Sequence, residues 1–216
     1  MKFQYLNRTS FYQYCKFNPF ILKFNMIIIL YMEKDIEIMY NWLNTHISLE
    51  TLLWLFPIMF LLHDFEEILF VELWFKKNYR KASEKVPGFF KKTFQNMSKI
   101  TAAQFTLPVV FQFLIYIIST FLAVEYQYYI PFLGFNLFLL LHVFMHIGQS
   151  FLVGVYTLGL GTAVTITFPY SIYLFYRLLD EEIVEITTIV AAFPYGVITI
   201  VIVLLGHKLA HKLIPS

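Results

Sequence analysis

A short run of ionisable residues, His63-Asp64-Phe65-Glu66-Glu67, interrupts a long apolar stretch of this sequence. At about 100° per residue of an α-helix, Glu66 and Glu67 lie about 60° and 40° on either side of His63, and Asp64 lies about 100° away. One imidazole and two carboxylates on one helix face can hold a divalent metal ion or transfer a proton. The run is not the H-E-x-x-H zinc motif, because no histidine stands four residues after His63.

A pair of histidines, His142 and His146, lies inside another apolar stretch. Residues four apart share one face of a helix, so both imidazoles can bind the same metal ion. This spacing often arises by chance, and its weight here comes from its surroundings. A charged side chain at mid-bilayer costs about 2.5–3.5 kcal/mol on insertion scales, so ionisable groups at that depth indicate a functional site.

The composition places both clusters in a membrane protein. Hydrophobic types make up 59% of the 216 residues and charged types 14%, against about 45–50% and about 25% in soluble domains. With a mean hydropathy of +0.66, the chain is neither a disordered protein nor a soluble nucleic-acid binder. A single cysteine, Cys15, excludes a disulfide scaffold and a zinc ribbon. We therefore predict an all-α fold, a polytopic transmembrane helical bundle.

Apolar stretches long enough to cross a bilayer, which takes about 20 helical residues, define the core of this bundle. We expect residues 32–216 to form a single transmembrane domain. Residues 1–31 are predicted to be an N-terminal extension or an upstream misreading of the start codon, with a short membrane segment as the alternative. The five predicted core spans lie at roughly 50–75, 99–124, 129–152, 156–178 and 186–207.

Lysine and arginine are distributed unevenly between the predicted loops. The loop at 76–99 holds eight of them, and basic loops lie on the cytoplasmic side of membranes. The segment at 180–185 is acidic and is placed outside, whereas Lys208 and Lys212 place the C-terminus inside. The sequence thus predicts a multi-pass protein of the cell membrane with a cytoplasmic C-terminus.

Depth in the membrane relates the two clusters. The first and third predicted spans run in the same direction, and His63 and His142 each lie near a midpoint. Glu67 and His146 follow four residues later, about 6 Å deeper at 1.5 Å per residue. Three imidazoles and two carboxylates, including Glu66, can therefore share one layer of the bundle.

Structural interpretations stay open beside the functional one. Protonated carboxylates can form hydrogen bonds between helices, the histidines can be packing residues, and an early end of the first span would leave Glu66 and Glu67 at the interface. Nearby polar residues have similar interpretations. Tyr156 is typical of an interface, although it can also cap the site, and the segment from Gly159 to Thr165 is typical of close helix packing.

The run from His63 to Glu67 has the pattern H-x-x-E-E, and the chain resembles the HXXEE family of small prokaryotic membrane proteins, which has no assigned function. A second motif of that family is N-x-x-x-H in a later span. The matching stretch here runs from His142 to His146, with histidine in place of asparagine. The resemblance covers roughly residues 50–210 and implies that the two motifs belong together.

The leading hypothesis is an intramembrane metal-dependent enzyme, hydrolase-like or oxidative, that acts on an apolar or lipid-like substrate. A divalent ion, either zinc or iron, suits a set of histidines and carboxylates, whereas copper(I) prefers sulfur. Glu67 is a fifth ligand or the general base, and it is the predicted catalytic residue. The predicted metal ligands are His63, Glu66, Glu67, His142 and His146.

Other functions can use the same side chains. A small transporter or proton-handling protein would employ them as a relay or a transient ion site. It would need to dimerise, because five short spans leave little room for a path. A haem protein with His63 or His146 as axial ligand is disfavoured by the adjacent carboxylates. The predicted partners are the lipid bilayer, a lipid-like small molecule and a second copy of the chain, and no nucleic acid.

Reporter fusions after residue 90 and after residue 182 test the predicted orientation. The distribution of lysine and arginine predicts opposite sides of the membrane, with the first reporter in the cytoplasm and the second outside. Two reporters on the same side would refute the orientation.

Overall fold

Helices dominate the part of the chain that the computed structural model describes, residues 34–215, and no strand occurs among them. The division into two compact units falls between Ser48 and Leu49, and the first unit contributes the helix Lys34–His46. The all-α prediction is confirmed for these residues, and the extension predicted at 1–31 lies outside them. The second unit contains α3 (Leu49–Lys85), α4 (Lys91–Met97), α5 (Ala102–Tyr126), α6 (Ile130–Val153), α7 (Leu160–Thr162), α8 (Phe168–Asp180), α9 (Ile186–Ala191) and α10 (Phe193–Leu213).

Within residues 34–215, three helical stretches are long and apolar enough to cross a membrane: α5, α6 and Ile186–Leu213, which comprises α9 and α10. The number rises to four if Lys34–His46 and α3 are counted as one span. By itself α3 carries more charge, because it contains the ionisable run at 63–67 and a lysine-rich end. Length and composition thus indicate a multi-pass membrane protein with three to four candidate spans.

The helix boundaries follow local sequence signals. Thr101 caps α5 through a reciprocal pair of hydrogen bonds with Gln104, so this helix begins at Ala102 rather than at residue 99. The first predicted span ends at residue 75, whereas α3 continues to Lys85. The additional residues are basic and polar, so the hydrophobic pattern alone does not reveal that they continue the helix.

The connection between α6 and α8 is the irregular part of the bundle. Gly154 and Gly159 have φ angles of 67° and 79°, so the predicted span 156–178 becomes helical only at α7. A π-helical segment, Ala163–Thr167, then precedes α8, in which Pro169 has no N–H to donate. Segments of this kind occur frequently at functional sites.

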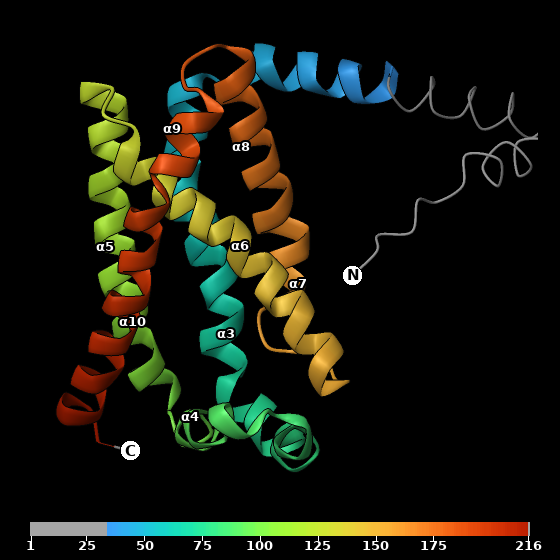
Figure 1. The fold of residues 1–216 in the computed structure, drawn as a ribbon, viewed down its shortest axis with the longest axis vertical. Helices are drawn as coiled ribbons and strands as arrows, with labels where there is room; N and C mark the ends of the chain where they lie inside the picture. Colours follow the sequence, from blue (N-terminus) through green and yellow to red (C-terminus); the bar gives the residue numbers. More distant parts are fainter. Residues whose placement is uncertain (1–33, 216) are drawn as a thin grey trace, which may run out of the picture. The chain divides into compact units, whose positions relative to one another are not determined.

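Four helices of the second unit meet at a layer of aromatic side chains. Figure 1 shows α5 and α10 side by side, with α3 and α6 next to them. The ring of Tyr116 on α5 lies 4.7 Å from the Phe60 ring on α3 and 5.1 Å from the Phe135 ring on α6. Its hydroxyl makes a 3.2 Å hydrogen bond with Thr199 of α10. This layer holds the register of the helices that carry the ionisable residues.

The helices α6 and α10 cross at a pair of glycines. A Cβ atom added to Gly196 would lie 2.5 Å from the carbonyl oxygen of Gly134 and 2.9 Å from Cβ of Phe138. Only a hydrogen atom fits at this contact, as in other membrane helices that pack through small residues.

Gly134→Ala should destabilise the bundle, because the added methyl group would overlap the carbonyl oxygen of Ala192, just before α10, and would lie 2.7 Å from Cβ of Tyr195. Over-packing of this kind costs about 1–3 kcal/mol. Gly148→Ala, on the same helix, is the matched control, since nothing lies within 4 Å of its added methyl group. Thermal unfolding in detergent compares the variants, and equal melting temperatures would rule out a tight crossing.

Candidate metal centre

The structure brings together ionisable side chains from α3 and α6. His63, Glu67, His142 and His146 each offer one donor atom, and these atoms all lie within 4.8 Å of one another. Two donors of a tetrahedral zinc ion, each about 2.1 Å from the metal, are about 3.4 Å apart. A small inward movement therefore closes the group around an ion. We refer to these residues as the His/Glu cluster.

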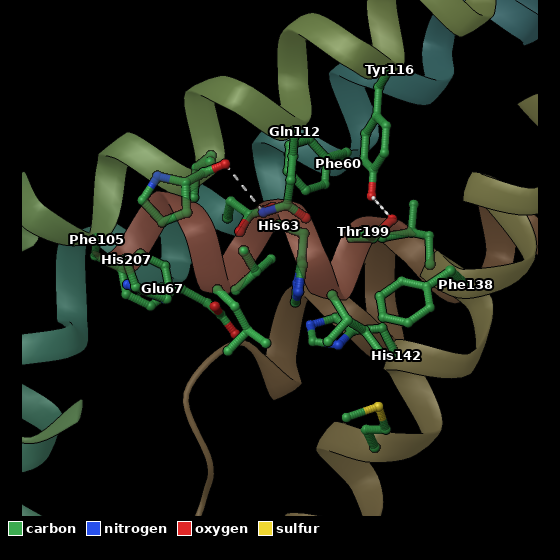
Figure 2. A pocket seen from close by; sticks show the side chains of 18 of the residues that line it. Phe60, His63, Glu67, Phe105, Gln112, Tyr116, Phe138, His142, Thr199 and His207 are labelled. Atoms are coloured by element: carbon green, nitrogen blue, oxygen red, sulfur yellow. Dashed lines mark hydrogen bonds between the residues drawn. The ribbon is translucent and has the colours of Figure 1, made fainter. Parts of the chain in front are cut away.

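The shortest contacts in the His/Glu cluster involve His146. Its Nε2 lies 2.8 Å from Nε2 of His142 and 3.3 Å from Oε1 of Glu67. The ring of His63 meets both imidazoles edge-on, with its centroid 5.5 Å from that of His142 and 5.0 Å from that of His146. Figure 2 shows His63, Glu67 and His142 facing the same space.

Burial makes the arrangement of these groups costly unless their polar atoms are satisfied. His63 and His146 are 1% and 4% exposed, and a buried polar group without a partner is destabilising. Among the described residues, Nε2 of His63 has no hydrogen-bond partner. A metal ion in the cluster would satisfy this nitrogen, because it would be bound together with three further donors.

Glu66 lies beside the cluster and contacts the segment that follows α6. Its Oε2 accepts hydrogen bonds from the backbone N–H and the hydroxyl of Thr162, at 2.9 and 2.7 Å. Its Oε1 accepts a 2.5 Å hydrogen bond from the hydroxyl of Tyr156. Both oxygens of this predicted ligand are thus engaged, and the group of converging donors does not include Glu66.

Thr162 connects Glu66 to His63. A hydroxyl has one hydrogen, and that of Thr162 is donated to the carboxylate of Glu66. The hydroxyl oxygen therefore accepts the 3.0 Å hydrogen bond that it shares with Nδ1 of His63, and Nδ1 carries the proton. The lone pair of His63 is then on Nε2, the nitrogen without a partner in the described chain. Outer hydrogen bonds of this kind orient histidines that bind metals.

The turn before α7 covers the cluster. A Cβ atom on Gly159 would lie 2.5 Å from Oε1 of Glu67 and 2.8 Å from Cε1 of His146. The hydroxyl of Thr157 donates a 3.1 Å hydrogen bond to the carbonyl oxygen of His146. Glycine is therefore needed at 159 both for its positive φ and for the space that the two side chains occupy. From sequence this segment is predicted to serve helix packing, because an irregular turn has no periodic pattern that would mark it as part of a site.

An apolar cavity of about 280 Å³ adjoins the cluster. His63, Glu67 and His142 line this cavity, together with Asp64, which is not one of the converging donors. The rest of the lining comes mainly from apolar side chains of α5, α6 and α10 (Figure 2). Apolar walls with a few polar groups are typical of small-molecule sites.

Thr162→Val should change the tautomer of His63, because valine can neither accept the Nδ1 proton nor donate to Glu66. NMR of the isotope-labelled parent protein should show His63 protonated at Nδ1, and the valine variant should lose that signal. Thr162→Ser keeps the hydroxyl and should retain it. The same His63 spectrum in all three proteins would disprove the connection through Thr162.

Comparison with known proteins bears on the two motifs. A family described as a protein of unknown function with HXXEE motif matches residues 54–174, which include both clusters of the sequence. No curated protein and no solved structure matches the chain. The matched region makes up more than half of the 216 residues and confirms the resemblance identified from the sequence motifs. The chain belongs to the HXXEE family.

Proposed function

We propose that this protein is an intramembrane metal-dependent enzyme, with a zinc or iron ion held by the His/Glu cluster between α3 and α6. The observation that supports it most is the convergence of four donor atoms within 4.8 Å in a chain with apolar spans. Nitrogen and oxygen donors suit both metals. Buried carboxylates and imidazoles are expensive in a bilayer, and binding an ion compensates for that cost.

The proposed chemistry divides the two adjacent glutamates between two roles. A bound divalent ion would polarise a substrate oxygen or activate water. Glu67 has a carboxylate oxygen 3.3 Å from His146 and serves as a ligand or as the general base that accepts a proton. Glu66 is a positioning residue, because its hydrogen bonds to Thr162 determine which nitrogen of His63 is free to bind.

The proposed membrane arrangement has five core spans, with α3 and the stretch 160–180 crossing alongside the three most apolar helices. In support, the ionisable side chains His63 and Asp64 of α3 are buried in the bundle. Leu69, on the same helix, is 68% exposed and can face lipid. We infer that the protein lies in the cell membrane. The positive charge of the loop at 76–99 favours a cytoplasmic position for that loop and for the C-terminus.

A proton-handling protein is the second candidate. The 2.8 Å contact between the Nε2 atoms of His142 and His146 requires a shared proton when no ion is bound. Glu67 extends this contact at 3.3 Å, and chains of histidine and glutamate carry protons in membrane pumps. Metal content distinguishes this candidate from the enzyme.

Purified parent protein should contain about one zinc or iron ion per chain, as expected for one site with three imidazoles and a carboxylate. His142→Ala and Glu67→Gln should each remove most of the metal. Loss of an outer hydrogen-bond partner already costs about 10–100-fold in affinity, and loss of a ligand should cost more. Elemental analysis of the purified variants provides the measurement.

Two matched controls accompany this experiment. Asp64→Asn changes a buried carboxylate that does not converge with the donors and should leave the metal content unchanged. His211→Ala removes an exposed imidazole from α10 and should also have no effect. Absence of metal from the parent and every variant would contradict the metalloenzyme and favour the proton relay.

A further inference from the structure

The cavity beside the His/Glu cluster has a size that restricts what can occupy it. Its volume of about 280 Å³ is close to the lower limit of the roughly 300–1,000 Å³ found for ligand sites. A lipid with two acyl chains and a large head does not fit such a volume, whereas a single chain does. The walls are apolar on three helices, with Val109, Leu139 and Val203 among them.

Contacts between the helices define the two ends of the cavity. At one end the ring of Phe60 lies 4.7 Å from that of Tyr116, whose hydroxyl bonds to Thr199. At the other end the rings of Phe105 and His207 lie 5.8 Å apart. All five side chains line the cavity. Along α5, the distance from Phe105 to Tyr116 is about 16 Å at 1.5 Å per residue, so the cavity is elongated along the bundle.

The His/Glu cluster faces the middle of this length. On α3, His63 and Glu67 follow Phe60, which marks the Tyr116 end. Further along α3, Oε1 of Glu72 accepts a 2.7 Å hydrogen bond from the backbone N–H of Ala102, at the start of α5 and close to the opposite end. Figure 2 agrees, since Glu67, His63 and His142 lie between the pair Phe105 and His207 and the pair Tyr116 and Thr199.

Basic residues accompany the Phe105 and His207 end. Nδ1 of His207 is buried and has no partner within residues 34–215. Lys208 follows it and is exposed, and Met97, which lines the cavity, is two residues from the exposed Lys99. Glu72 of α3, which comes close to this end, is engaged with the start of α5. A negatively charged group is therefore favoured here.

We propose that the cavity binds a single-chain fatty acid, with its carboxylate at the His207 end and its chain extending past His63 and Glu67 towards Tyr116. The apolar walls accommodate the chain, and His207, Lys208 and Lys99 complement the head. The further statement that the cluster acts on the middle of the chain rests on the proposed function. Binding of the fatty acid itself does not depend on it.

Photolabelling tests the location of the chain. The full-length protein in neutral phosphatidylcholine bilayers is irradiated with a fatty acid that carries a diazirine at mid-chain, and the labelled peptides are identified by mass spectrometry. Label should appear on α5, α6 and α10 residues of the cavity, and excess unlabelled fatty acid should displace it. Label that is restricted to lipid-facing side chains, or that is not displaced, would overturn the proposal.

A pair of tryptophan variants on α10 provides the matched control. Val203→Trp fills the cavity, whereas Val201→Trp lies on a side chain that is 53% exposed and not part of the lining. The first should reduce labelling about tenfold, because the indole ring occupies the space that the chain would fill. The second should label as the parent does. Equal labelling of both variants would exclude this cavity as the site.

The charge of the head and the role of the metal are tested in the same samples. An alkylamine with the same diazirine chain should label less, and Lys208→Glu should reduce labelling by the fatty acid; equal labelling by amine and acid would contradict the placement of the head.

Elemental analysis separates the two proposals. If the cavity is labelled displaceably and the protein contains no metal, fatty-acid binding is supported and the metalloenzyme is refuted. If the protein contains metal and the cavity is not labelled, the metalloenzyme is supported and fatty-acid binding is refuted.

Discussion

The cost of burying ionisable side chains in an apolar bundle is the constraint on which the rest of this structure depends. Each such group needs a partner, and the chain supplies some partners from segments far apart in sequence and others from the same helix. Glu66 is satisfied by Tyr156 and Thr162, and the imidazoles of His142 and His146 approach each other. These contacts leave the converging donor atoms of the His/Glu cluster able to bind a metal ion.

The fold around the cluster meets two opposing demands. On one side, the aromatic layer around Tyr116 and the crossing at Gly134 and Gly196 hold α3, α5, α6 and α10 close together. On the other side, the turn before α7 must approach the cluster without filling it, which the absence of a side chain at Gly159 permits. The cavity lies where the close packing is interrupted, so that a ligand can reach the same donors.

Much of this arrangement follows from patterns that are visible in the sequence. Hydrophobicity predicts the helices, because burial in lipid demands long apolar stretches. Helical periodicity and matched depth predict that His63 and Glu67 meet His142 and His146, and the structure places their donor atoms within 4.8 Å. The same helical positions predict that Asp64 stands apart. These predictions rest on regular helices, whose geometry is known in advance.

Other parts could not be predicted, because they depend on irregular segments. Glu66 and Glu67 lie on either side of His63 at similar angles, and the contacts of Glu66 with Tyr156 and Thr162 distinguish it from Glu67. The position of Thr162 depends on a turn with two positive φ angles and on a π-helical segment. Neither segment has a periodic pattern in the sequence. A prediction that treats the residues from 156 onwards as one regular helix therefore does not place Thr162 beside Glu66.

X-ray absorption spectroscopy of the purified parent protein determines whether the His/Glu cluster is a metal centre, as proposed above. We expect a zinc or iron edge that corresponds to about one ion per chain, with nitrogen and oxygen scatterers at about 2.0–2.2 Å and the outer-shell pattern of several imidazoles. No edge above background, or a first shell that contains sulfur, would contradict it.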